Sequence, residues 1–254
     1  MKLMKKLIIL CFTTLLVFSF NITDIAKASE VSETSLSLKD KLEVTNRMHD
    51  EGSSDWDIQN VLRKIEKGEV LESEKAMADE QVFFFSFEEL EELEYFQNNK
   101  LEKKVEFKDG SYLKSEIILE AEDISNLKNR NIALAANGAF KTFTVKGVGT
   151  HADASYKVSI FIDTHLGNSY INKVYPHPNI AAHLGTHSDT KQGTTRKYEN
   201  RAKKIPAQAY LYFKYTNFAN LSSQDMYLKV FVGDHYQNQY GIKVTYTNGK
   251  GYIK

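Results

Sequence analysis

The sequence predicts a mainly β protein with a small α-helical N-terminal part and a C-terminal antiparallel β-sandwich, either immunoglobulin-like or jelly-roll-like. From residue 139 on, at least six short segments alternate apolar with polar residues, as strands do when one face of a sheet is buried. The three prolines of the chain fall between these segments and leave them uninterrupted. Short alternating strands joined by turns are typical of sandwiches and barrels.

The first residues predict the compartment. A basic start, "MKLMKK", precedes the apolar run "LIILCFTTLLVFSF" at 7–20, and Ala26 and Ala28 then form a small-x-small pair. This is the order of a secretory signal peptide, which we place at residues 1–28. We expect the mature chain to be secreted and to meet a membrane only through this peptide before cleavage. The alternative is an uncleaved anchor, although the run is short for a membrane span.

Cysteine content and charge exclude several classes of protein. The chain has one cysteine, Cys11, which lies inside the predicted signal peptide. A mature chain without cysteine forms no disulfide, no thiolate zinc site and no cysteine nucleophile. The 33 basic residues are balanced by 33 acidic ones, so no basic excess supports binding to nucleic acid.

Two short helices are predicted over residues 39–68, separated at Gly52. Ser53 or Ser54 is placed to cap the second helix, because a hydroxyl at this position accepts from free backbone amides. Trp56 begins the apolar stripe of that helix. We therefore expect this helical hairpin to dock on the rest of the protein through the indole ring.

A strand, a helix and a hairpin follow. The apolar run "QVFFFSF" (81–87) reads as a buried strand, and the acidic run at 88–99 reads as a helix with a solvated face. Residues 103–119 predict a β-hairpin, because Asp109-Gly110 is a favoured two-residue turn between alternating segments.

A domain boundary is expected near residue 130, because the polar residues 120–131 read as a linker or short helix. The helical segment and its hairpin then occupy 29–130, and the sandwich occupies 131–254. Residues 176–204 are predicted to form a long loop. The predicted strands of the sandwich are 139–150, 154–163, 169–175, 207–216, 226–233 and 239–249.

Two segments carry a resemblance. The segment "IQNVLRKIEKGEVLES", with Gly68 and Glu69, is followed by the pattern F-x-DGSY at 107–112. This arrangement is similar to that of uncharacterised secreted proteins of Gram-positive bacteria. The resemblance implies an extracellular compartment and a helical segment ahead of a β-domain, and it brings no activity or catalytic residue with it.

The stretch "YPHPNIAAHLGTHSD" contains three histidines, His177, His183 and His187. Their separations are even, so an extended segment would present them on one side, where they could bind zinc. A proline and a glycine interrupt the segment, however, and no glutamate flanks His183 as a zinc protease site requires. The alternatives are an ordinary loop and a surface that senses pH through histidine charge.

Acid–base and nucleophilic candidates lie at two strand ends. "GVGTHADAS" contains His151 and Asp153, and "FIDTHLGNS" contains Asp163 and His165. A Ser–His–Asp triad can be drawn from almost any chain of this size, and no G-x-S-x-G elbow supports one. Both segments can equally well be ordinary turns at the ends of strands.

Tyrosine and basic residues suggest a binding surface. Many of the 14 tyrosines come late in the chain, among them Tyr210 and Tyr212. Tyrosines on one sheet face could stack on sugars or contact a protein, although strands favour tyrosine in any case. The neighbouring run "RKYENRAKK" begins with Arg196 and Lys197, which could contact an anionic polymer.

These observations lead to two hypotheses. The first is a secreted, non-enzymatic binding module that uses Tyr210, Tyr212, Arg196 and Lys197, without a cofactor, on a cell-wall polymer, a glycan or an extracellular protein. The second is a metal-dependent secreted hydrolase that holds zinc with His177, His183 and His187. A secreted toxin is a further class, which the balanced charge disfavours.

Overall fold

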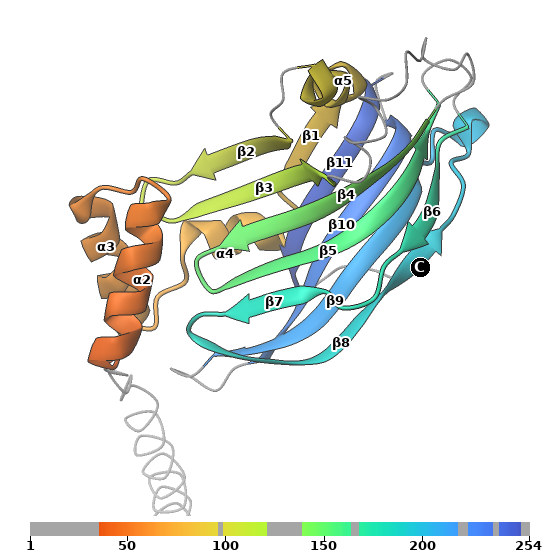
Figure 1. Cartoon of the computed structure of the whole chain (residues 1–254). Coiled ribbons are helices and arrows are strands. Elements are labelled where there is room, and N and C mark those ends of the chain that lie inside the picture. The colour runs from red at the N-terminus through yellow and green to blue at the C-terminus, as the bar shows by residue number, and fades with distance from the viewer. Residues whose placement is uncertain are drawn as a thin grey trace, which may run out of the picture. The chain divides into compact units, whose positions relative to one another are not determined.

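The computed structural model describes residues 36–95, 99–120, 139–163, 168–217, 223–235 and 239–249. Two antiparallel sheets pack against each other (Figure 1), which confirms the predicted mainly β sandwich. The five-stranded sheet has, in order, β1 (Val82–Ser86), β11 (Gln239–Asn248), β10 (Ser223–His235), β9 (Ala207–Asn217) and β8 (Gly185–Arg196). The six-stranded sheet has β2 (Lys100–Glu106), β3 (Tyr112–Leu119), β4 (Ala139–Gly149), β5 (Ala152–Ile162) and β6 (Tyr170–Val174), with β7 (Asn179–Ala182) also beside β5.

Most neighbouring strands are consecutive along the chain. Strands β2 to β6 follow one another across the six-stranded sheet, and β8 to β11 do so across the other. Immunoglobulin and jelly-roll sandwiches instead use Greek-key connections between sheets. The signals that predict a sandwich, alternation and turns, contain no information about this order.

The core lies between the inner faces of the two sheets. Alternate residues of most strands point inward, among them Phe143 of β4, Tyr156 of β5 and Phe213 of β9, all buried. Gly147 lets the sheets approach, since a Cβ atom there would stand 2.7 Å from the Tyr246 ring. This burial of apolar surface accounts for a domain that holds together without disulfides.

The helices α2 (Leu38–Asp50) and α3 (Asp55–Glu66) confirm the predicted helical hairpin. Ser54 caps α3 in a reciprocal pair with Asp57, as a hydroxyl at this position favours. The two helices form a second apolar cluster with the ends of β3, β4 and the β7–β8 turn, whose members are Val44, Met48, Ile58, Val61, Leu62, Ile65, Leu71, Tyr112, Val148 and Leu184.

The predicted docking through Trp56 is wrong, because 65% of this side chain is exposed. Trp56 lies in the first turn of α3, and the buried stripe of that helix starts only at Ile58. A third helix, α4 (Glu72–Ala78), follows and was not expected. The strand β1 and the helix α5 (Phe87–Tyr95) agree with the predictions for 81–87 and 88–99.

The hairpin of β2 and β3 is present, with a connection that spans 107–111 rather than two residues. Asp109 in this turn is buried and accepts from Lys64 Nζ and from the Glu72 amide, each at 2.9 Å. The turn therefore ties α3 and α4 to the six-stranded sheet.

The expected boundary near residue 130 does not separate the sheets. Strand β1 pairs with β11, and β3 pairs with β4, so strands from both sides of residue 130 build each sheet. The predicted linker at 120–131 and the predicted signal peptide at 1–28 lie outside the described residues, apart from Glu120. None of the described helices is long and apolar enough to span a membrane.

The predicted loop at 176–204 is wrong as well, because it contains β7 and the long strand β8. Strand β8 is an edge strand whose side chains are largely exposed, so its sequence is rich in Thr, Ser and Gly. Apolar alternation, the signal used for the other strands, is absent from such an edge. A short 3₁₀ turn, Arg201–Lys203, completes the segment.

Candidate functional site

A groove lies on the outer face of the six-stranded sheet. It encloses about 390 Å³ and is lined by Thr144, Ser155, Tyr156, Lys157, Tyr175, Pro176, His177 and Asn179, which we call the sheet groove. Thr144 and Lys157 are direct cross-strand neighbours of β4 and β5. The turn between β6 and β7 supplies the wall with Tyr175 and His177. A space of this size is in the range of small-ligand sites.

Charges in the sheet groove are arranged around Lys157. Its ammonium lies 2.7 Å from Glu120, which also accepts from the Thr144 hydroxyl at 2.5 Å. Burial disfavours the Glu120 carboxylate, but these two bonds outweigh it and lower its pKa. The ammonium groups of Lys157 and Lys173 lie 5.9 and 4.5 Å from the ring centre of Tyr175, so two cations flank this aromatic wall.

Farther along the same face lies an aromatic cluster of Phe140, Phe161, Tyr170 and Tyr198. Phe140 and Phe161 meet edge to face at 5.1 Å, and Phe161 stacks on Tyr170 at 5.0 Å between ring centres. Tyr198 lies 5.3 Å from Tyr170. Phe140 is 54% exposed and Tyr198 is 59% exposed, although apolar surface of this size is usually buried.

Register explains why the rings meet. Phe140 pairs with Phe161, and Phe161 pairs with Tyr170, so the three rings stand in one row across β4, β5 and β6. Two steps along each strand return to the same face, so the row shares its face with the pair Thr144 and Lys157. The aromatic cluster and the sheet groove therefore lie on the same face of the six-stranded sheet.

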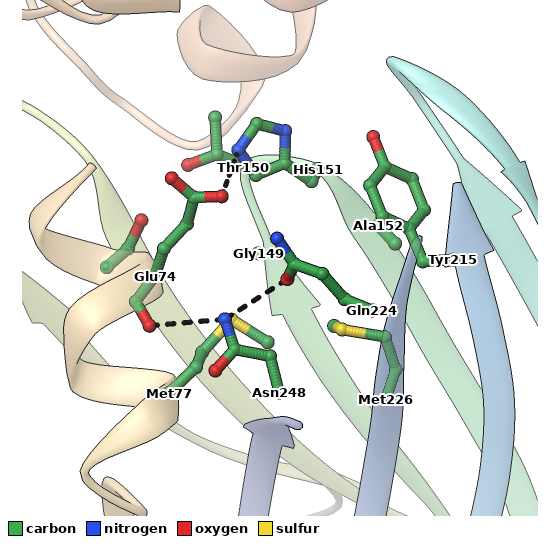
Figure 2. Close-up of a pocket in the computed structure, with 11 residues that line it drawn as sticks. Glu74, Met77, Gly149, Thr150, His151, Ala152, Tyr215, Gln224, Met226 and Asn248 are labelled. Atoms are coloured by element: carbon green, nitrogen blue, oxygen red, sulfur yellow. Dashed lines mark hydrogen bonds and ion pairs between the residues drawn. The ribbon is translucent and has the colours of Figure 1, made fainter. Parts of the chain in front are cut away.

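A second pocket, at one end of the sandwich, is a closed polar cluster (Figure 2). Glu74 of α4 reaches His151 in the β4–β5 turn at 3.0 Å between Oε1 and Nε2, an approach too poorly aligned for a hydrogen bond. Asn248 donates to the Glu74 carbonyl at 3.3 Å and to Gln224 at 3.2 Å. The pocket has about 10 Å³ for a water-sized molecule, so it has no room for an organic ligand.

Electrostatics in this cluster favours ionised carboxylates. Burial alone would raise the pKa of Glu74, but His151 and the Leu71 amide, 2.8 Å away, outweigh it and lower the pKa. The same balance holds for Asp153. Burial raises its pKa, but His183 and Arg47 outweigh burial, so the pKa of this carboxyl is lowered. These charges join the helical part to the sandwich.

The structure does not bring the three predicted zinc ligands together. His177 lines the sheet groove with a left-handed backbone (φ 65°), while His183 is mostly buried 3.4 Å from Asp153 and Glu43. His187 lies on β8, opposite Tyr215. Within the described residues, which include all of 175–189, no three His, Cys, Asp or Glu side chains are placed to hold a metal ion.

The four predicted ligand-binding residues are divided between two faces. Tyr210 and Tyr212 lie on the outer face of the five-stranded sheet, where the Tyr212 hydroxyl donates to Asp225 at 2.8 Å. Arg196 pairs with Gln208 next to them and donates to the Pro206 carbonyl at 2.7 Å. Lys197 instead lies 5.5 Å from the ring of Tyr198, at the aromatic cluster.

Sequence reasoning missed the aromatic cluster. Phe140 and Phe161 occupy the outward positions of their strands, out of step with the buried Phe143 and Ile160. Aromatic residues at the outward positions of two neighbouring strands are a pattern in the sequence that could have indicated this cluster. The contribution of Tyr198 has no such signal, because the polar segment around it predicts a loop.

Comparison with known proteins adds little. No family model matches the chain, and no curated protein matches it. Among solved structures, the chain is similar to a hypothetical protein of Listeria monocytogenes EGD-e at 15% identity, with a TM-score of 0.30. That match covers 59% of this chain and 98% of the other. A likeness of this degree carries no argument about fold or function.

Proposed function

We propose that this protein is a secreted, non-enzymatic binding module for a glycan chain of the cell wall. The observation that carries the proposal is the exposed aromatic cluster of Phe140, Phe161, Tyr170 and Tyr198, in line with the sheet groove. Secretion is supported by the basic and apolar residues at 1–28.

The chemistry of the surface suits sugars. Aromatic rings offer flat apolar faces to the C–H faces of pyranose rings, and the neighbouring hydroxyl and amide groups can bond to sugar hydroxyls. Thr144, Ser155 and Asn179 supply such groups in the sheet groove. A chain of several sugars would cover the row of rings and continue into the groove.

The test is affinity electrophoresis of residues 29–254 in gels that contain a soluble glycan, with a panel of amylose, β-glucan, mannan and chitin oligosaccharides. A pull-down on purified peptidoglycan completes the panel. We expect at least one glycan to retain the protein and the double variant Phe140→Ala, Tyr198→Ala to bind about tenfold more weakly, since each ring contributes roughly 0.5–1.5 kcal/mol.

Trp56→Ala is the matched control, because it removes an equally exposed aromatic ring from α3, outside the cluster. Its binding should equal that of the parent protein. The proposal fails if no glycan or peptidoglycan retains the protein, or if the control loses as much binding as the double variant. Secretion is tested separately by the mass of protein recovered from the medium, which should correspond to cleavage after Ala28.

A further inference from the structure

The outer face of the five-stranded sheet, away from the aromatic cluster, mixes lysines with aromatic rings. Strand register arranges this face in three rows across the sheet. The rows are Lys191–Tyr212–Tyr227–Thr247, Gly193–Tyr210–Lys229–Thr245 and Gln208–Phe231–Lys243–Phe84. We call this surface the lysine face.

Lys229 stands at the centre of the lysine face and is only 5% exposed. Its ammonium lies 5.2 Å from the Tyr227 ring centre and, among the described residues, has no hydrogen bond or ion pair. Burial lowers its pKa, and the charge of Glu80 opposes this only partly. The stem of Lys229 is buried against its neighbours, but the ammonium is not one of the fully buried unpaired polar atoms of the described residues. The charged end therefore reaches the surface of the sheet, where an anion from outside can contact it.

A second group next to it also lacks a partner. The Thr247 hydroxyl is buried, and within the described part of the chain it makes no hydrogen bond. Thr247 shares a row with Tyr227 and a strand face with Thr245, the direct neighbour of Lys229. The Thr247 hydroxyl lies too deep to meet an external ligand directly, so the accessible donors here are those of the Lys229 ammonium, which suit the acceptor oxygens of a phosphate.

Other cations extend the site across the sheet. Lys191 lies 5.7 Å from the Tyr212 ring centre and Lys243 lies 4.9 Å from that of Phe231, and neither has an ion pair among the described residues. With Lys214 and Arg196 there are five cations against the carboxylates of Asp189, Asp225 and Glu80. From β8 to β11 is three strand spacings, about 14 Å, which exceeds the reach of a single phosphate.

We infer that the lysine face binds a linear polymer of phosphate groups, with Lys229 as the central contact and Lys191 and Lys243 on either side. This site lies on the opposite sheet from the aromatic cluster and does not depend on the proposed glycan binding. Because its affinity comes from several neutralised phosphates, binding weakens steeply as salt rises.

The test is titration of residues 29–254 with linear polyphosphate at several salt concentrations, with inorganic phosphate and polyglutamate as comparison probes. We expect polyphosphate to bind most tightly. Lys229→Met and the pair Lys191→Gln, Lys243→Gln should each weaken it and reduce the slope of log affinity against log salt by about one unit per lysine. Lys229→Met should keep the melting temperature, because the buried stem is replaced by an apolar chain of similar size.

The matched control is Lys39→Gln, Lys67→Gln, which removes two exposed lysines from the helical part. Its affinity and salt slope should equal those of the parent protein. The inference is overturned if polyphosphate does not bind, if the control weakens binding as much as the lysine-face pair, or if inorganic phosphate or polyglutamate binds as tightly as polyphosphate. Glycan retention in the same variants reports on the other face, so the two proposals fail separately.

Discussion

The guanidinium of Arg47 in α2 clamps the β4–β5 turn next to Asp153, the second residue of β5. It donates to the Gly149 carbonyl at 2.7 Å and to the Thr150 carbonyl at 3.0 Å, and it lies 3.3 Å from the Asp153 carboxylate. One side chain therefore satisfies two carbonyls and one charge at the β4–β5 turn. Since α2 is far from this turn in sequence, the contact fixes the helical part on the end of the sandwich.

Arg47→Met should lower the free energy of unfolding by about 2 kcal/mol, because charge-assisted hydrogen bonds contribute roughly 1.5–3 kcal/mol each and the loss leaves Asp153 with one partner fewer. Arg47→Lys keeps the charge without the fork of donors and should lose less. Urea denaturation measures both variants. Equal stability of Arg47→Met and the parent protein would show that the clamp does not hold the helices.

Acid should destabilise the fold through Glu74 and Asp153. Both carboxyls have a lowered pKa in the folded protein. Their contribution to the free energy of unfolding is therefore complete above their usual pKa near 4, and it is lost as the pH falls through the lowered pKa of the folded state. The free energy of unfolding should therefore decrease steadily below about pH 5.

The contribution of Glu74 to this acid sensitivity is isolated with the variant Glu74→Gln, whose side-chain amide is neutral at every pH. Its curve of stability against pH should be flatter than that of the parent protein between about pH 5 and pH 2, measured by urea denaturation at each pH. Glu92→Gln, at an exposed carboxyl of α5, is the control for a general change of charge. A parallel shift of the Glu74→Gln curve, without a change of slope, would contradict the assignment.

Gly147→Ala should destabilise the sandwich by about 1–3 kcal/mol, because the added Cβ would overlap the Tyr246 ring in a packed core. Gly149→Ala is the neighbouring control: its Cβ would meet its nearest atoms at 3.4 Å or more, an ordinary contact. Thermal melts of the two variants should differ clearly. Equal melting temperatures would mean that the two sheets can move apart at Gly147 without cost.

The helical part should depend on Ile58 and not on Trp56. Ile58→Ala removes a buried side chain from the second apolar cluster and should cost about 2–5 kcal/mol. Trp56→Ala changes an exposed ring and should stay within about 0.5 kcal/mol of the parent protein. Urea denaturation of both variants decides between docking through the stripe and docking through the indole.

Much of the fold could be predicted from local patterns. The alternation of β4 and β5, the capping serine before α3 and the Asp109–Gly110 turn all act between residues close in sequence, so they identify elements directly. Strand β8 could not be predicted in this way, because an exposed edge strand needs no apolar alternation. Helix α4, with seven residues, is too short to show a clear period.

The sequence by itself determined most of the strands and helices, because hydrogen bonding and alternation depend on near neighbours. Only the tertiary structure decided which distant residues share a surface. Tyr198 reaches the ring of Phe140 through Tyr170, with which it forms an isolated bridge, and Arg47 meets Asp153 across about a hundred positions of chain. Strand order and register govern such meetings, and they are set by how the whole core packs. For the same reason three closely spaced histidines, His177, His183 and His187, ended in three different environments.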